Sequence, residues 1–244
     1  MPAFFKKDEM ETRLDELYQN AQVIEYDREK KFVFFSDLHL GKRAPDDAFQ
    51  PNEKIFLDTL NQYSPSEWTL CLGGDIYDLW KNQFQSDIVS QYPTVFGKMD
   101  PFKIFEIVGN HDRELQNIYP EAYRLKNKDS GKEIFWHHGY ADDLLNDQLW
   151  QASRDFLRYV IAPVEDITKL RSLISPAANA DRHAEVRTRL KAWANGNKIT
   201  SIFGHIHYQE HDGYYWNDGC GVHVGSIECI EMVNDELGVR VFKS

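Results

Sequence analysis

The chain has 244 residues, of which 42% are hydrophobic and 27% are charged, as in ordinary globular proteins. This composition excludes a disordered, collagen-like or coiled-coil chain, and no apolar run approaches the ~20 residues that a membrane-spanning helix needs. Because 28 basic residues face 39 acidic ones, the net charge is −11, and there is no block of Lys and Arg. Nucleic acid is therefore a disfavoured partner.

The N-terminal sequence and the cysteines indicate a cytoplasmic protein. Residues 1–17 turn acidic at once and contain neither the apolar core nor the cleavage site of a signal peptide. Cys71, Cys220 and Cys229 are odd in number and form no CxxC pair, so neither a disulfide framework nor a thiolate zinc site is predicted. We expect three buried thiols and, at this length, a single domain over residues 1–244.

In chain order, the first predicted element is a helix over residues 8–20, which we expect to cover a sheet edge. Short apolar runs then predict strands at 32–36, 68–73, 103–108, 133–138, 200–204, 222–230 and 239–242. Helical patterns separate the early strands at 52–62 and near 84–96. The early alternation of strands and helices predicts an α/β fold, and the late run of strands departs from it.

The segment 141–194 differs from the rest of the chain. It shows little strand-like alternation, many helix formers, and interruptions at Pro163 and Pro176. We interpret it as two or three helices that form a cap or insertion within the domain. The alternative is a set of ordinary structural helices packed on the core.

Polar side chains follow five of the predicted strands, at the point where each strand ends. They are Asp37 and His39, Asp75 and Asp78, Asn110 and His111, His138, and His205 and His207. Functional groups of sheets flanked by helices gather beyond the carboxyl ends of strands, so we expect these side chains to converge. Extended residues two apart point to the same side, which predicts that each of the pairs 37/39 and 205/207 faces one cavity.

The types of these side chains indicate the class of metal. Carboxylate, imidazole and amide groups without thiolate suit Mn, Fe or Zn, and even seven of these nine side chains are too many for one tetrahedral zinc. They fit two divalent ions that share a bridging carboxylate. Such a pair can hold a bridging hydroxide as nucleophile and neutralise phosphate oxygens, which is the chemistry of phosphoester hydrolysis.

The ordered motifs D-x-H, G-D, G-N-H-D, H-G and G-H-x-H, from Asp37 to His207, resemble those of the calcineurin-like metallophosphoesterase family. The resemblance implies a four-layer α/β/β/α sandwich with two bound ions, for which we expect Mn, with Fe or Zn as alternatives. It also implies the ligands: Asp37, His39 and His207 for one ion, Asn110, His138 and His205 for the other, and Asp75 as the bridge.

Further assignments follow around these motifs. His111 is the expected general acid, and Asp78 its expected orienting carboxylate, with a helix-start cap as the alternative for Asp78. For Asp112 a cap is the favoured interpretation. His138 directly precedes the motif glycine and is expected to reach the ions, so His137 is expected to pack elsewhere, since neighbours on a strand face opposite ways.

Fewer residues are candidates for contact with the substrate than for binding the metal ions. Asn110, Arg43 and Arg113 could meet a phosphate, although each arginine could equally be a solvated surface residue. Trp80, Trp150 and Trp193 could line an apolar pocket or pack in the core. The runs SDLHLG and GDIYDLW resemble the bacterial UDP-2,3-diacylglucosamine hydrolases, which cleave a pyrophosphate in lipid A synthesis and carry a helical insertion between the fourth and fifth motifs. His111 departs from that subgroup, which has arginine there.

Three function classes therefore stand. The first is a two-metal hydrolase of a small or lipid-linked phosphoester, which for a lipid-linked substrate would contact the inner membrane face peripherally. The second is a nuclease or phosphodiesterase of the same fold, against which the acidic balance speaks. The third is a non-catalytic interaction module on a decayed site, which predicts missing ligands, whereas all seven are present.

Overall fold

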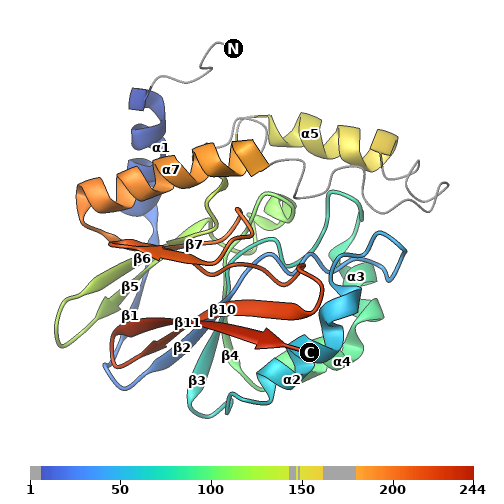
Figure 1. The fold of residues 1–244 in the computed structure, drawn as a ribbon, viewed down its shortest axis with the longest axis horizontal. Coiled ribbons are helices and arrows are strands. Elements are labelled where there is room, and N and C mark those ends of the chain that lie inside the picture. Colours follow the sequence, from blue (N-terminus) through green and yellow to red (C-terminus); the bar gives the residue numbers. More distant parts are fainter. Residues whose placement is uncertain (1–6, 143–146, 148, 162–179) are drawn as a thin grey trace.

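The computed structural model describes residues 7–142, 147, 149–161 and 180–244. Two β-sheets lie face to face, and helices cover the outer face of each sheet (Figure 1). The predicted α/β/β/α sandwich is therefore confirmed. Within the described residues, no helix is long and apolar enough to cross a membrane.

The five-stranded sheet contains the three strands that end in the first three motifs. β2 (Lys31–Phe35), β3 (Trp68–Leu72) and β4 (Lys103–Glu106) run parallel in adjacent positions. β10 (Ser226–Val233) pairs antiparallel with β2, and β11 (Glu236–Lys243) pairs antiparallel with β10. The parallel strands therefore bring their carboxyl ends, and the motifs that follow, to the same edge.

The six-stranded sheet has the order β1-β5-β6-β7-β9-β8. β6 (Glu133–His137) and β7 (Thr200–Phe203) are adjacent and parallel, so the fourth and fifth motifs also lie together. The sequence did not predict the remaining strands, which are β1 (Gln22–Tyr26), β5 (Ala122–Asn127), β8 (Glu210–Asp212) and β9 (Tyr215–Asn217).

An aromatic core fills the space between the sheets. Because side chains alternate along a strand, Phe32 and Phe34 of β2 point inward, whereas Val33 and Phe35 point to the outer helices. Phe34 meets Trp136 of β6 edge to face, with ring centroids 5.3 Å apart. This contact joins the two sheets close to the strand ends from which the motif loops start.

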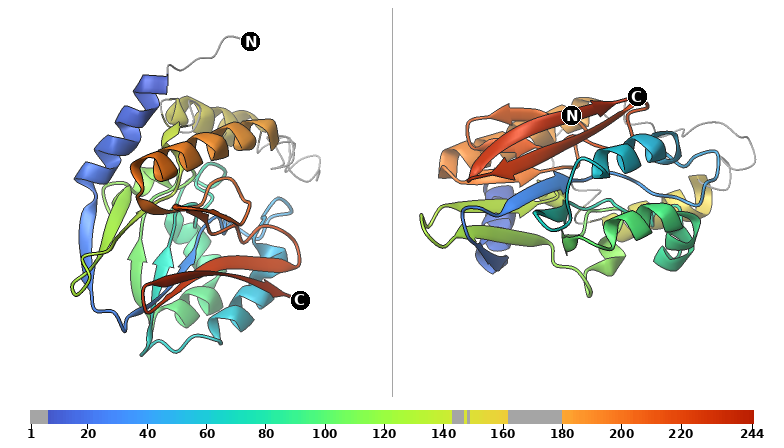
Figure 2. Two further views of the ribbon diagram at one scale, coloured as in Figure 1. Left: turned by 60° about the vertical axis from the view of Figure 1, so that its left-hand side comes forward. Right: turned by 90° about the horizontal axis from the view of Figure 1, so that it is seen from below.

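Helices α2 (Glu53–Leu60), α3 (Gln85–Gln91) and α4 (Pro93–Met99) cover the five-stranded sheet, on the opposite side of the molecule from α1 (Lys7–Asn20) and α7 (Ala180–Asn197) (Figure 2). The single helix predicted near 84–96 is two helices, because Pro93 lacks the N–H that would continue the first. The expectation for the first helix was wrong. Leu14 and Leu17 pack with Phe135 and Phe203, so α1 covers the sheet face rather than its edge.

The predicted insertion 141–194 is described in part. Residues 143–146, 148 and 162–179, with Pro163 and Pro176, lie outside the described residues. The described part contains the short helix η3 (Tyr140–Asp142), α5 (Trp150–Phe156), the π-helical turn η4 (Leu157–Ile161) and α7. Val186, Leu190 and Trp193 of α7 are buried against the six-stranded sheet, so this helix packs on the core.

Candidate active site

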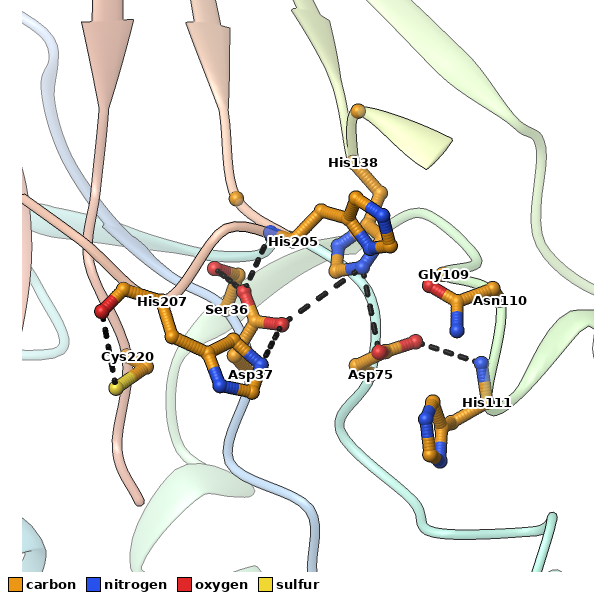
Figure 3. Close-up of polar contacts among 12 residues, drawn as sticks. Ser36, Asp37, Asp75, Gly109, Asn110, His111, His138, His205, His207 and Cys220 are labelled. Atoms are coloured by element: carbon orange, nitrogen blue, oxygen red, sulfur yellow. Dashed lines mark hydrogen bonds and ion pairs between the residues drawn. The ribbon is translucent and has the colours of Figure 1, made fainter. Parts of the chain in front are cut away.

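The five motif loops meet at one end of the two sheets (Figure 3). Backbone hydrogen bonds join the first loop to the second, since Asp37 N donates to Gly74 O at 3.0 Å and His39 N donates to Asp75 O at 2.9 Å. The fifth loop is joined to the fourth, since Gly204 N donates to His138 O at 2.8 Å. The convergence predicted from the sequence is thus present in the structure.

The first group of possible ligands is Asp37, His39 and His207, whose candidate ligand atoms all lie within 4.8 Å of one another. Asp37 Oδ1 is 3.0 Å from His207 Nε2 and 3.7 Å from His39 Nε2. The two imidazole nitrogens are 3.3 Å apart. This is the set that the resemblance assigns to one ion.

The second group is Asp75, His138 and His205, which meets the same 4.8 Å limit. Asp75 Oδ2 lies 3.3 Å from His138 Nε2 and 3.6 Å from His39 Nε2, so its carboxylate stands between the two groups, where a bridging ligand is expected. Asn110 is buried beside Asp75 (Figure 3).

The hydrogen bonding of these groups tests whether they suit a metal. Among the described residues, the buried atoms Asn110 Oδ1 and His207 Nδ1 have no hydrogen-bond partner, while Asp37 Oδ1 and His138 Nε2 make ion-pair contacts alone, with His207 Nε2 at 3.0 Å and Asp75 Oδ2 at 3.3 Å. Buried polar atoms are rarely left unpaired, and all four are of types that ligate divalent ions. Two carboxylates, one amide and four imidazoles therefore fit a pair of divalent ions.

The electrostatics of the cluster also favour bound cations. Burial alone would raise the pKa of Asp37, but the nearby imidazoles of His138 and His207 outweigh it and hold that pKa well below its ordinary value. Burial alone would lower the pKa of His138, but the carboxylates of Asp75 and Asp37 raise it to about 10. The site thus holds buried negative charge that attracts a proton or a metal ion.

The backbone at these ligands differs from the expectation. Extended geometry was expected for the pairs 37/39 and 205/207, but these residues have positive φ, in the left-handed region that non-glycine residues seldom adopt. The values are 52° at Asp37, 48° at His39, 53° at Asp75, 69° at His205 and 53° at His207. Such strain is retained where surrounding contacts fix the chain, and it concentrates at functional sites.

Two motif glycines allow the loops to approach closely. A Cβ at Gly109 would lie 2.1 Å from Asp75 Oδ1, and a Cβ at Gly204 would lie 2.3 Å from Ser36 Oγ. Any side chain at either position would displace a carboxylate of the cluster or its hydrogen-bond partner.

His111 is positioned by three contacts. Its Nδ1 is 2.9 Å from Asp78 Oδ1, its backbone N–H donates to Asp75 Oδ1 at 2.7 Å, and its ring stacks on Trp80 with centroids 4.4 Å apart. Trp80 is fixed in turn, since its Nε1 donates to Asn110 O at 2.6 Å. Of the three tryptophans considered, Trp80 stacks on His111, Trp150 lies with its ring centroid 5.7 Å from the guanidinium of Arg113, and Trp193 packs in the core against Phe135.

The pair of His111 and Asp78 stabilises an imidazolium. Burial lowers the pKa of His111, but the charges of Asp75 and Asp78 outweigh it and raise that pKa above its ordinary value. Burial likewise raises the pKa of Asp78, and the hydrogen bond to His111 lowers it to about 2. The side chain of Asp78 therefore pairs with the imidazole of His111 instead of capping the start of a helix.

Asp112 is not the helix cap that was expected. It precedes the short helix η2 (Arg113–Leu115) but makes no side-chain cap there. Its Oδ1 accepts from Gly109 N at 2.6 Å and its Oδ2 accepts from Ile76 N at 2.8 Å. The carboxylate therefore ties the second motif loop to the third.

Ser36 and Asp218 support the cluster, and the sequence analysis missed both. Ser36 Oγ lies 2.5 Å from Asp37 Oδ2 and 2.6 Å from Asp218 Oδ1. One hydroxyl proton cannot serve two carboxylates, and burial together with the charge of Asp37 raises the pKa of Asp218 well above its ordinary value. We therefore expect a proton on Asp218, which would let Asp218 donate to Ser36 while Ser36 donates to Asp37. Asp218 follows the last motif, so no motif signal points to it.

Two further histidines flank the cluster. His137 is buried on the outer face of the sheet, where its ring is parallel to that of Phe135 with centroids 6.1 Å apart, as expected of the neighbour of His138. His183 was missed. It lies on α7 with its ring 6.0 Å from each of the rings of His205 and His207. His183 lies three residues before Val186 and seven before Leu190, so helical spacing places it on the same face of α7 as these buried residues. That spacing is the sequence pattern from which its inward position could have been predicted.

Both arginines considered for phosphate binding pair with acidic side chains. Arg113 is buried and donates to Asp147 Oδ1 at 2.8 Å, beneath the ring of Tyr140. Arg43 donates to Glu53 Oε1 at 2.6 Å. The part of Arg43 and Arg113 in substrate binding remains a prediction.

The chain matches the model of a known protein family and is similar to several solved structures. A family model described as calcineurin-like phosphoesterase matches residues 30–220. One similar solved structure is a protein serine/threonine phosphatase from Saccharomyces cerevisiae, with 13% identity, 99% of this chain and 91% of that chain covered, and a TM-score of 0.43. A second is a cold-active protein-tyrosine phosphatase from a psychrophilic Shewanella, with 13% identity, 91% of this chain and 83% of that chain covered, and a TM-score of 0.41. A third is a predicted phosphoesterase from Streptococcus pneumoniae, with 14% identity, 88% of this chain and 98% of that chain covered, and a TM-score of 0.36. No curated protein sequence matches the chain.

Proposed function

Since the chain belongs to the calcineurin-like phosphoesterase family and is a metal-dependent phosphoester hydrolase, we propose that the convergent motif loops form its active site. Asp37, His39 and His207 would hold one divalent ion, and His138 and His205, with the buried Asn110 beside them, would hold the other. Asp75 would be the ligand that they share. When bound, the ions supply Lewis acidity toward the phosphate group and activate a water molecule.

His111 protonates the leaving oxygen in this proposal. Because its Nδ1 is engaged by Asp78, the proton to be transferred is carried on Nε2. Trp80 fixes the plane of the ring by stacking on it. The carboxylates of Asp75 and Asp78 raise the pKa of His111, which favours the protonated imidazole that a general acid requires.

One observation supports this function above the others. Two groups of buried ligand atoms, several of them without hydrogen-bond partners among the described residues, lie on either side of one carboxylate. The test is hydrolysis of bis-p-nitrophenyl phosphate after removal of metal and titration with Mn²⁺, Zn²⁺ or Fe²⁺. We expect activity that depends on added metal, with Mn²⁺ the best activator, and that is abolished in Asp75→Asn. Activity that survives chelation or that substitution would contradict the assignment.

For the substrate, we propose a nucleotide-sugar or lipid-linked pyrophosphate of the UDP-2,3-diacylglucosamine type. The runs SDLHLG and GDIYDLW support it, as does the place of the segment 141–194 between the fourth and fifth motifs. Arg158, in the described part of that segment, pairs with Glu114 and donates to the carbonyl of Leu79, next to Trp80. We propose that the enzyme is cytoplasmic and that a lipid-linked substrate would bring it to the inner membrane face.

A substrate panel decides between this proposal and the alternatives. We expect cleavage of a nucleotide-sugar pyrophosphate to exceed that of monoesters, cyclic diesters and single-stranded DNA in kcat/KM. Preferential cleavage of DNA or of cyclic diesters would instead identify a nuclease or phosphodiesterase of the same fold. Since His111 replaces the arginine of the resembling subgroup, preference for a monoester would reject the substrate proposal and leave the hydrolase intact.

A further inference from the structure

A group of potential metal ligands outside the active-site cluster lies in and after the loop between β9 and β10. A sulfur of Cys220, a ring nitrogen of His223 and a carboxylate oxygen of Glu228 all lie within 4.8 Å of one another. Cys220 is buried, Glu228 is half-buried and His223 is exposed, so the group opens to solvent at the histidine. None of these residues belongs to the ligand set proposed above.

The backbone holds Cys220 and Glu228 against each other. Cys220 N donates to Glu228 Oε2 at 3.3 Å, and Glu228 N donates to Cys220 O at 3.2 Å. Gly219 makes room for this approach, because a Cβ there would lie 2.1 Å from Glu228 Oε2. The carboxylate is therefore fixed beside the cysteine before any ligand arrives.

Asn52 fixes the part of the loop that bears His223. Its Nδ2 donates to Gly221 O at 2.7 Å and to His223 O at 2.8 Å, and its Oδ1 accepts from Gly225 N at 2.8 Å. The side chain of Asn52 is fully buried, and both of its amide hydrogens and its oxygen are used. Such a bound asparagine stiffens the loop and limits the positions that the imidazole can take.

The three donor types point to a particular class of ion. Thiolate, imidazole and carboxylate together favour Zn²⁺, which binds three protein ligands and leaves one tetrahedral position for water. The other two cysteines offer no such site. Cys71 and Cys229 lie within apolar core clusters, and neither belongs to a group of potential ligands within the described residues.

We propose that Cys220, His223 and Glu228 form a third metal site that takes one Zn²⁺ or another thiophilic divalent ion. Binding forms a sulfur–metal bond and releases the thiol proton to solvent, without any change of oxidation state. Cys220 Sγ lies 4.0 Å from His207 O, and Gly221 N donates to Asp37 O at 3.1 Å. An ion held here is therefore linked through the backbone to two residues of the active-site cluster.

Cadmium is a suitable probe, because thiolate ligation to Cd²⁺ gives an ultraviolet charge-transfer band that oxygen and nitrogen ligands do not give. The full chain is titrated with Cd²⁺ in a thiol-free reductant. We expect a band that saturates at about one equivalent per chain in the wild type and in Asp75→Asn, so that it reports on this site whether or not the proposed active site binds metal. The band should disappear in Cys220→Ser.

His223→Gln and His211→Gln form a matched pair, since both histidines are exposed and only His223 belongs to the group. We expect His223→Gln to weaken the Cd²⁺ affinity by about tenfold or more, and His211→Gln to leave it unchanged. A wild type without the band, or a band that persists in Cys220→Ser, would overturn the proposal. If Cys220→Ser does not fold, an unchanged affinity in His223→Gln would overturn it equally.

Discussion

His111 Nδ1 lies 2.9 Å from Asp78 Oδ1, and this contact helps to stabilise the protonated imidazole on which the proposed reaction depends. The charge of Asp75 and the paired carboxylate of Asp78 together raise the pKa of His111, while the stacked Trp80 fixes the ring. A general acid is active only while protonated, so activity is lost as pH rises through its pKa. The contact therefore extends activity to higher pH.

Replacing Asp78 by Asn is expected to lower kcat by roughly 10–100-fold, because the imidazolium loses its charged partner. The alkaline limb of the kcat/KM profile should move to lower pH, since the pKa of His111 falls. Both are measured from initial rates across pH with saturating metal. Asp87→Asn, which removes a carboxylate from an ion pair with Lys42 at the surface, serves as the control. A profile that stays in place in Asp78→Asn would argue against the pairing.

Metal binding should strengthen as pH rises. The carboxylates of Asp75 and Asp37 overcome the effect of burial and raise the pKa of His138 to about 10, so below that pH an ion must displace a proton from this ring. For one displaced proton the apparent affinity rises about tenfold per pH unit. Calorimetric Mn²⁺ titrations at pH 6, 7 and 8, in buffers of different ionisation enthalpy, report the affinity and the protons released. An affinity that does not change between pH 6 and pH 8, without proton release, would contradict the protonated state of His138 on which this prediction rests.

Gly109→Ala should abolish activity, because the new Cβ would overlap Asp75 Oδ1 and displace the proposed bridging carboxylate. Gly97→Ala is the matched control, since a Cβ at Gly97 meets nothing within 4 Å and the residue lies within helix α4. We expect Gly97→Ala to retain activity and to raise the free energy of unfolding by about 0.5–1 kcal/mol. Rates and urea unfolding of both variants check this. Full activity in Gly109→Ala would be incompatible with the described approach of the loops.

Asp218→Asn should be tolerated, whereas Asp218→Ala should not. If Asp218 is neutral and donates to Ser36, an amide can donate in its place and keep Ser36 directed at Asp37. Alanine leaves a buried hydroxyl short of one partner, which costs about 1–3 kcal/mol of unfolding free energy. Chemical denaturation of the two variants measures the difference. Equal destabilisation by Asn and Ala would indicate that Asp218 is ionised.

The sequence was sufficient to predict the strands that bear the motifs, because apolar runs such as those of β2 and β3 are buried on both faces and are recognisable locally. β1, β5, β8 and β9 were missed for the opposite reason. β1 and β5 mix apolar and polar residues without a regular alternation, and β8 and β9 span three residues each, so their partners in the sheet define them.

The site was predicted where residues lie inside motifs and missed where they do not. Asp75 and His138 carry local signals, whereas Asp218 and His183 come from a late loop and from α7 and reach the cluster only through the fold. The positive φ at the ligands was also beyond sequence reasoning. It is imposed by hydrogen bonds between loops that are distant in sequence, such as Asp37 N to Gly74 O.

Anomalous diffraction from crystals grown with Mn²⁺ is the most direct test of the dinuclear centre. We predict two peaks about 3.5–4 Å apart on either side of Asp75. One should lie among Asp37, His39 and His207, and the other among Asn110, His138 and His205. A single peak, or none, in crystals grown at a saturating Mn²⁺ concentration would contradict the two-ion site.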